Sequence, residues 1–190
     1  MATAILLPDG DVSAAWTDGT GSAPWFTEID EDVESPDDAN YIQKTEGANN
    51  ISRFTFSNLP GDWASTNTIT LKIRHRGDSF IDDNDFIRLQ MYASGTFKGG
   101  QKDCAHSETI LNESFTDGVW DSLTEADQND IEVEVKYIKS TTAMADAGRN
   151  LKMFALSILL DYNTAGGDPE GLLIGGKLIG RGILGGRLIA

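Results

Sequence analysis

Four segments of this chain alternate between apolar and polar residues with a period of two. They are residues 68–76, 86–92, 131–138 and 153–162. Because successive side chains of a β-strand point to opposite faces, this alternation is typical of a half-buried antiparallel strand. We therefore predict four strands that each bury one face. The predicted inward positions are Ile69, Leu71, Ile73, His75, Ile87, Leu89, Met91, Ile131, Val133, Val135, Tyr137, Phe154, Leu156, Ile158, Leu160 and Tyr162.

Shorter apolar runs and frequent turn signals surround these strands. Residues 3–7, 51–57 and 107–115 are weaker strand candidates, with a short extended piece at 41–43. Turn-forming residues interrupt the runs at short intervals. Many short strands without a long helical period predict an all-β fold, an antiparallel sandwich or barrel. The turn signals are Pro8-Asp9-Gly10, Asp18-Gly19, residues 58–61, 76–78 and 98–100, and Asp117-Gly118.

Helix is expected in one place with clear support. Ser122 and Glu125 have the spacing of a capping box, so one or two helical turns are predicted over residues 121–127. Residues 143–150 are a weaker candidate for a second short helix.

The C-terminal residues follow neither period. After a linker-like run at 163–171, apolar pairs recur every five residues, with glycine and a basic residue between them. This spacing matches neither an amphipathic helix nor a regular strand, and the glycines favour short extended pieces that turn corners. We therefore divide the chain into a sandwich domain (1–162), a linker (163–171) and an extended Gly/Leu/Ile-rich tail (172–190).

A tail of this kind cannot bury its own leucines and isoleucines, which predicts contacts with neighbouring chains. One simpler interpretation is a last strand of the sandwich with a frayed end. A flexible linker is another, although nine Leu or Ile residues in this tail count against it. The predicted assembly contacts are Leu173, Ile174, Leu178, Ile179, Ile183, Leu184, Leu188 and Ile189, together with Lys177, Arg181 and Arg187.

The charge is strongly negative and unevenly distributed. The chain has 15 basic and 30 acidic residues, a formal net charge of −15. Residues 1–43 contain ten carboxylates and no Lys or Arg, whereas residues 171–190 contain three basic residues and no acid. This balance argues against nucleic acid or an anionic membrane as a partner. An acidic head and a basic tail are able to attract each other, within one chain or between copies.

Neither end of the chain resembles a targeting or membrane segment. The N-terminus lacks a basic region and a long apolar run, so no signal peptide is expected. The frequent glycines and the basic residues of the tail argue against a transmembrane helix. We expect a protein made and used without secretion by that route, and the single cysteine is compatible with a reducing cytoplasm.

The residues that usually carry catalysis or bind metals are few. Cys104 is the only cysteine, and His75 and His106 are the only histidines. Cys104 and His106 are two apart, but a metal site needs at least one or two more ligands. His75 lies on an inward strand face and is expected to be a core histidine. We therefore predict no metal centre here, no cofactor and no Cys–His nucleophile.

Two acidic turns are candidate Ca²⁺ sites. One contains Asp82, Asp83 and Asp85 between two strong strands, and the other contains Asp9 and Asp11. Ca²⁺ takes six to eight oxygen ligands, which loops rich in Asp and Asn can supply. Neither turn has the frame of an EF-hand. The simpler interpretation is a solvated turn held by local hydrogen bonds.

A basic stripe runs along one predicted strand through Lys72, Arg74 and Arg76. No aromatic residues interleave with it, so we do not expect nucleic acid to bind there. Glu132 and Glu134 alternate in the same way on another strand, which predicts a cross-strand charge ladder. The acidic run 30–34 is expected to be a solvated loop or a face that meets basic residues.

Several aromatic residues are candidates for sugar binding. Exposed tryptophans on a β-sandwich can stack on sugar rings, although the local context favours loop anchors that pack the ends of the sandwich. A carboxylate-based hydrolase is a further alternative, but nothing singles out an acid and a nucleophile among the many carboxylates. The aromatic residues are Trp16, Trp25, Phe26, Tyr41, Trp63 and Trp120.

Four phrases of the sequence resemble β-sandwich modules in structural proteins of tailed bacteriophages. They are Leu7-Pro-Asp-Gly-Asp-Val-Ser-Ala-Ala-Trp16, Phe26-Thr-Glu-Ile-Asp-Glu31, Pro36-Asp-Asp-Ala-Asn-Tyr-Ile-Gln43 and Trp120-Asp-Ser-Leu-Thr-Glu-Ala-Asp127. The resemblance covers roughly residues 5–162. In contrast to modules that occur in tandem or within longer fibres, this chain has one copy fused to a basic tail.

The resemblance implies a jelly-roll-like sandwich in a virion, as a capsid cement or decoration protein, a head fibre, or a tail or neck component. It implies no catalytic residues. The expectation is a non-enzymatic structural protein that contacts other virion proteins through its tail and forms a homo-oligomer, with a trimer as one option. The alternative from another class is a carbohydrate-binding, host-adhesion module.

Overall fold

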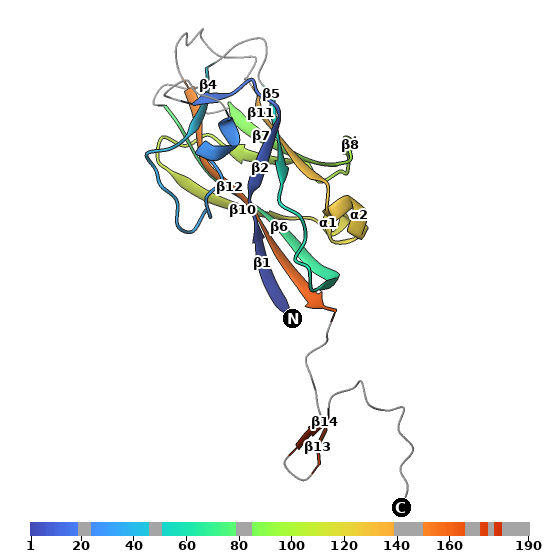
Figure 1. Ribbon diagram of the computed structural model, residues 1–190. Coiled ribbons are helices and arrows are strands. Elements are labelled where there is room, and N and C mark those ends of the chain that lie inside the picture. Colours follow the sequence, from blue (N-terminus) through green and yellow to red (C-terminus); the bar gives the residue numbers. More distant parts are fainter. Residues whose placement is uncertain are drawn as a thin grey trace, which may run out of the picture.

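The computed structural model describes residues 1–18, 24–45, 51–78, 85–138 and 150–165, together with the backbone of 172–174 and 177–179. Over these residues the chain forms two six-stranded antiparallel sheets that share one hydrophobic core (Figure 1). The predicted all-β sandwich is therefore confirmed. None of the described helices is long and apolar enough to cross a membrane.

The first sheet is built around β12 (Asn150–Thr164). One edge of β12 pairs along its length with β6 (Trp63–Gly77), and β10 (Leu111–Thr116) pairs with the far edge of β6. The other edge of β12 pairs with β1 (Ala2–Leu6) and β4 (Ile42–Thr45). The short strand β3 (Thr17–Asp18) extends the sheet beyond β4.

Ile29 lies beside the part of β12 that separates β1 from β4. The N–H of Leu156 donates a hydrogen bond to the carbonyl of Ile29 (3.1 Å), just after the 3-10 helix η1 (Trp25–Glu28). Ile29 is fully buried and belongs to the core cluster. The acidic loop after η1 (residues 30–38) is thus attached to the first sheet along β12, one of the two 15-residue strands of that sheet.

The second sheet is built around β11 (Ile131–Ile138), which pairs with β5 (Ile51–Phe56) and β7 (Phe86–Ala93). The outer strands are β2 (Pro8–Ser13), next to β5, and β8 (Thr96–Phe97) and β9 (Lys102–Ala105), both next to β7. Two helices of four residues, α1 (Gly118–Asp121) and α2 (Glu125–Gln128), connect β10 to β11.

The hydrophobic alternation correctly identified the core. The predicted inward residues of β6, β7 and β11 are all buried, and all but His75 are members of one hydrophobic cluster. On β12, a bulge between Met153 and Ala155 leaves Phe154 without a cross-strand partner. Met153 therefore takes the core position, and Phe154 packs against Tyr41 instead (5.7 Å between ring centroids). Phe154 is buried as predicted, but it lies outside the main cluster because a bulge shifts the side-chain alternation by one residue.

Two local predictions also need correction. Pro8-Asp9-Gly10 was predicted to be a turn but begins β2, an edge strand whose register shifts beside β5. Edge strands and bulges tolerate proline and glycine, so the turn signal was misleading there. Residues 107–115 contain the start of β10 only at Leu111, and β9 precedes them as a separate strand.

The helical region was predicted correctly, but its capping residues were not. Thr124 and Asp127 form the capping box of α2, whereas Ser122 follows the end of α1 and donates to the carbonyl of Val119 (2.9 Å). Residues 143–149 of the second helix candidate lie outside the described residues, and Asn150 already belongs to β12.

The tail contains two short strands, β13 (Leu172–Ile174) and β14 (Lys177–Ile179), which pair antiparallel. The register places Leu173 opposite Leu178. Three residues of strand followed by Gly175 and Gly176 account for the first five-residue repeat. These are short extended pieces, as the spacing predicted, although they form a regular ladder with each other.

Candidate functional site

One histidine, the single cysteine and a glutamate meet between the two sheets. Nε2 of His75 lies 2.6 Å from Oε2 of Glu113, and these atoms and Sγ of Cys104 all lie within 4.8 Å of one another. His75 and Cys104 are buried, and the side chain of Glu113 is 27% exposed. We refer to these three residues as the His–Cys–Glu cluster.

The register of the strands explains why these side chains meet. On β10, Glu113 pairs with Ile73 of β6, so it shares the inward face of His75. On β9, Cys104 pairs with Ile87 of β7, an inward residue of the second sheet. The cluster therefore joins side chains from both sheets across the core.

Burial keeps the cysteine of this cluster unreactive. Burial and the nearby Glu113 carboxylate both raise the pKa of the Cys104 thiol. Burial also lowers the pKa of His75, although the hydrogen bond to Glu113 acts in the opposite direction. A nucleophilic cysteine needs a lowered pKa, so this environment is unsuited to a Cys–His nucleophile.

His106 lies close to the cluster, over Gly77. A Cβ atom added at Gly77 would be 2.3 Å from Cδ2 and 2.4 Å from Nε2 of His106. The N–H of Gly77 donates to the carbonyl of Ser107 (2.7 Å), which fixes the segment after β9 against the end of β6. Glycine at position 77 thus allows the second imidazole to approach the strand that carries His75.

Sequence reasoning singled out His75, Cys104 and His106 but missed Glu113. Glu113 is one of 30 acidic residues, and nothing in its immediate sequence distinguishes it. Only the pairing register of β10 with β6 places it beside His75, and that register depends on residues far apart in the chain.

The candidate Ca²⁺ turns show no assembled oxygen cage among the described residues. Asp82 and Asp83 lie outside these residues, whereas Asp85 is buried and accepts a hydrogen bond from the Tyr137 hydroxyl (2.6 Å). In the other turn, Asp9 accepts from the Thr55 hydroxyl (2.6 Å). Asp11 accepts from the backbone N–H groups of residues 25 and 26 (2.7 and 2.9 Å), at the start of η1. The described carboxylates thus serve hydrogen bonds within the fold.

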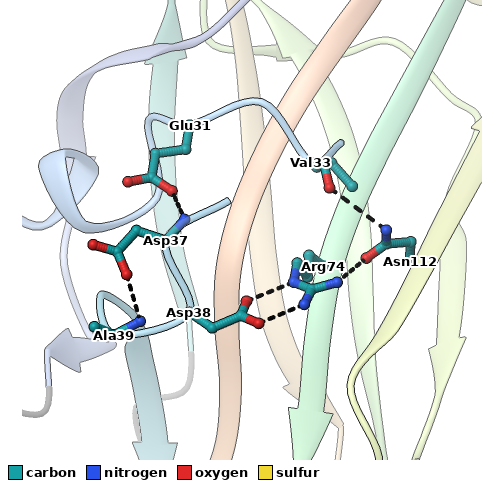
Figure 2. Close-up of polar contacts among 7 residues, drawn as sticks. All are labelled: Glu31, Val33, Asp37, Asp38, Ala39, Arg74 and Asn112. Carbon is teal, nitrogen blue, oxygen red and sulfur yellow. Dashed lines mark hydrogen bonds and ion pairs between the residues drawn. The ribbon is translucent and has the colours of Figure 1, made fainter. Parts of the chain in front are cut away.

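The basic stripe on β6 meets the acidic loop of residues 30–38. Figure 2 shows the guanidinium of Arg74 paired with both carboxylate oxygens of Asp38 (2.6 and 2.5 Å) and also bonded to Asn112 (2.8 Å). Lys72 pairs with Glu34 (2.9 Å). The hydrogen bond from Arg74 is the main reason why the pKa of Asp38 is lowered. Within the predicted acidic run 30–34, Glu34 is the residue that meets the stripe, which agrees with the interpretation of a face that contacts basic residues; Asp38 lies beyond that run.

The predicted ladder between this stripe and Glu132 and Glu134 was wrong. Those glutamates lie on β11 of the other sheet and pair with Arg53 of β5 (3.2 and 2.8 Å). Arg53 also lies over the ring of Tyr92, 3.8 Å from its centroid. The alternation was read correctly, but the sheet assignment of the two strands could not be read from it.

The tryptophans anchor the fold, as their local context predicted. Trp16 and Trp120 are fully buried, and Trp25 and Trp63 are partly buried against the core. The indole N–H of Trp120 donates to the carbonyl of Gly99 (3.1 Å). Trp63 also lines a pocket with Glu125 and Asn129.

The structure describes part of the predicted assembly tail. The backbone of Leu173, Ile174, Lys177, Leu178 and Ile179 lies in the β13–β14 hairpin. The remaining predicted contacts lie outside the described residues: Arg181, Ile183, Leu184, Arg187, Leu188 and Ile189. Comparison with known proteins adds no relative, since no protein-family model and no curated protein sequence matches the chain.

Proposed function

We propose that this chain is a non-enzymatic structural protein of a tailed-phage virion, of the capsid cement, decoration or fibre type, and that it assembles through its tail. The observation that carries the proposal is the pairing of β13 and β14. Among the described strands they pair only with each other and extend neither sheet of the sandwich. The phage assignment rests on the sequence resemblance, and the assembly role rests on the tail.

A hairpin of this size needs a partner. Isolated two-stranded hairpins are marginally stable in water, and the β13–β14 hairpin of the tail has only three residues in each strand. Both outer edges of such a hairpin offer unpaired N–H and C=O groups that can accept another strand. The tail also carries apolar pairs at 173/174, 178/179, 183/184 and 188/189. At about 25 cal/mol per Å² of apolar surface, burying half of these side chains would contribute several kcal/mol before ordering costs.

The charges of the sandwich limit which acidic groups are available to the tail. Glu34 and Asp38 belong to the acidic block 1–43 but are already paired with Lys72 and Arg74. An attraction between the basic tail of one copy and the acidic block of another would therefore use the other carboxylates of the block.

The decisive experiment is a measurement of solution mass by light scattering after size exclusion. We expect an oligomer for the full chain and a folded monomer for a chain that ends at residue 166. Replacing Leu178, Ile179, Ile183 and Leu184 with serine should also give a folded monomer. A matched variant that exchanges Leu for Ile and Ile for Leu at the same positions should still assemble, because apolar volume is kept. Monomers of the full chain, or oligomers of the serine variant, would refute tail-driven self-assembly.

The virion assignment needs a separate measurement. Mass spectrometry of purified particles of the phage that encodes this chain should detect it in stoichiometric amounts. Its presence only in the lysate, and not in the particles, would contradict the assignment while leaving the assembly result intact.

The pocket at Trp63 keeps the carbohydrate-binding alternative testable. A sugar bound beside Trp63, Glu125 and Asn129 should quench tryptophan fluorescence saturably. A glutamine in place of Glu125 should weaken that binding without unfolding the protein. A flat titration across a panel of polysaccharides would count against this alternative.

A further inference from the structure

We propose that His75, Cys104 and Glu113 bind a transition-metal ion of the Zn²⁺ class and that this ion links the two sheets of the sandwich. The proposal is independent of the virion assignment and of assembly through the tail. It rests on the distances, burial and ligand chemistry of the His–Cys–Glu cluster.

The three ligand atoms are already close to the spacing that zinc requires. Zinc binds sulfur at about 2.3 Å and nitrogen or oxygen at about 2.0–2.2 Å, so the ligands of a tetrahedral site lie about 3.3–3.8 Å apart. In the structure, Nε2 of His75 and Oε2 of Glu113 are 2.6 Å apart, and all three atoms lie within 4.8 Å. An ion would separate the first pair and draw the sulfur in, with shifts of about 1 Å.

The ligand types favour zinc over the hard cations. Imidazole and thiolate are ligands of zinc and related metals, whereas Ca²⁺ and Mg²⁺ take oxygen ligands. A thiolate, a carboxylate and a divalent ion also form a neutral unit. That neutrality matters because His75 and Cys104 are 1% and 0% exposed, and an unbalanced charge would be costly there. Metal binding would release the proton of the Cys104 thiol.

The fourth ligand position has two possible occupants, water and His106. Glu113 is 27% exposed, so its side of the cluster is open to water. His106 packs over Gly77, two residues after His75 on the same strand. The two arrangements differ in whether His106 contributes to affinity.

Such an ion would connect distant parts of the chain. His75 and Glu113 belong to β6 and β10 of the first sheet, and Cys104 belongs to β9 of the second. Since β10 and β9 are outer strands, the metal would fasten one edge of the sandwich. Zinc should therefore raise the thermal unfolding temperature of the protein in a concentration-dependent way.

The first test titrates the metal-stripped, reduced full chain with Co²⁺ and then with Zn²⁺. We expect a thiolate-to-cobalt charge-transfer band and the strong visible bands of tetrahedral cobalt at one equivalent, both abolished by competing zinc. Cys104→Ser should remove the charge-transfer band. His75→Gln and Glu113→Gln should each weaken zinc binding by more than the roughly 10–100-fold that loss of a supporting group costs. His106→Gln should weaken zinc binding by as much as these two variants only if His106 is the fourth ligand.

Asp103→Asn is the matched control. Asp103 adjoins Cys104 but pairs with Arg88 (2.7 and 2.8 Å), so this variant should retain the cobalt spectrum. Because the Cys104→Ser variant also loses a buried side chain of the core, thermal unfolding of the unmodified chain provides a second measurement. Zinc should raise its unfolding temperature, and should fail to do so in His75→Gln. The proposal is overturned if no thiolate band appears, or if zinc binds equally well to all of the ligand variants.

Discussion

The sandwich and the tail both carry many leucines and isoleucines, but they place them with different periods. In β6 the apolar residues alternate, and Ile69, Leu71 and Ile73 are fully buried within the same chain. In the tail the apolar pairs recur every five residues, and β13 and β14 pair only with each other among the described strands. A strand with a period of two can join a long ladder, whereas a five-residue repeat interrupted by glycine forms ladders too short to make a core.

This difference separates folding from assembly. β6 and β12 are each 15 residues long and contribute most of the first sheet's core face. The sandwich should therefore fold without the tail, and the tail should act only when another chain is present. The predictions below test that separation, starting with the change of largest effect.

Replacing Leu71 with alanine should destabilise the sandwich by about 3–4 kcal/mol, because it leaves a cavity in a fully packed core. Leu71 is 0% exposed and lies in the middle of β6. Urea denaturation followed by tryptophan fluorescence would measure this. The serine variant of the tail described above should leave the free energy of unfolding of the monomer unchanged. A large loss of stability in the tail variant would show that the tail belongs to the sandwich.

Gly100→Ala should destabilise the sandwich by about 2–3 kcal/mol, because alanine is strained in the left-handed backbone conformation of this position and its Cβ would clash with Trp120. Gly100 has φ +70, and an added Cβ would lie 2.4 Å from Nε1 of the buried Trp120. Gly95 has the same φ with no atom within 4 Å of such a Cβ. Gly95→Ala is thus the matched control and should cost about 1 kcal/mol. Equal losses in both variants would show that contact with Trp120 is unimportant.

Ser52→Ala should cost about 1–2 kcal/mol, because it leaves two backbone donors without their acceptor. The buried Ser52 hydroxyl accepts hydrogen bonds from the N–H groups of Ala15 (2.9 Å) and Trp16 (2.8 Å). Thermal unfolding would report the loss. Ser52→Thr retains the hydroxyl acceptor, so its stability should lie between that of Ser52→Ala and that of the unmodified chain. An alanine variant as stable as the unmodified chain would mean that water or a backbone shift replaces the serine.

The sequence predicted the strands better than it predicted their neighbours. Alternation depends on whether a residue is inside or outside, so it correctly placed His75 in the interior. It contains no information on which strands pair, so it joined Lys72 and Arg74 to Glu132 and Glu134, which lie in the other sheet. Pairing depends on contacts between distant segments, and these became visible only in the structure.

The same limit applies to the candidate metal site. Cys104 and His106 are close in sequence and were considered together, whereas Glu113 reaches His75 only through the register of β10 with β6. The bulge at Phe154 is a related case, because a single inserted residue reverses the alternation locally without a sequence signal of its own. Local periodicity therefore predicted the burial of individual positions, while sites built from several strands required the fold.

The smallest predicted effect concerns the ion pairs between the acidic loop and β6. Asp38→Asn should destabilise the protein by less than about 1 kcal/mol at neutral pH, since the Asp38 side chain is 41% exposed and surface pairs contribute little. The pKa of Asp38 is lowered in the folded state, mainly by the hydrogen bond from Arg74. A lowered folded-state pKa stabilises the protein above the unfolded value of about 4, and this contribution is lost as the pH falls further.

The stability difference between Asp38→Asn and the unmodified chain should therefore shrink as the pH is lowered below about 4 and as salt is added. Glu34→Gln is the comparison variant, because Glu34 accepts a single contact from Lys72 and its side chain is 62% exposed. It should have a smaller effect with the same pH dependence, since Lys72 also lowers the pKa of Glu34. If neither variant changes stability at low salt, the acidic loop is held on the sheet by its buried residues, Ile29 and Val33, and its carboxylates remain available to a partner chain.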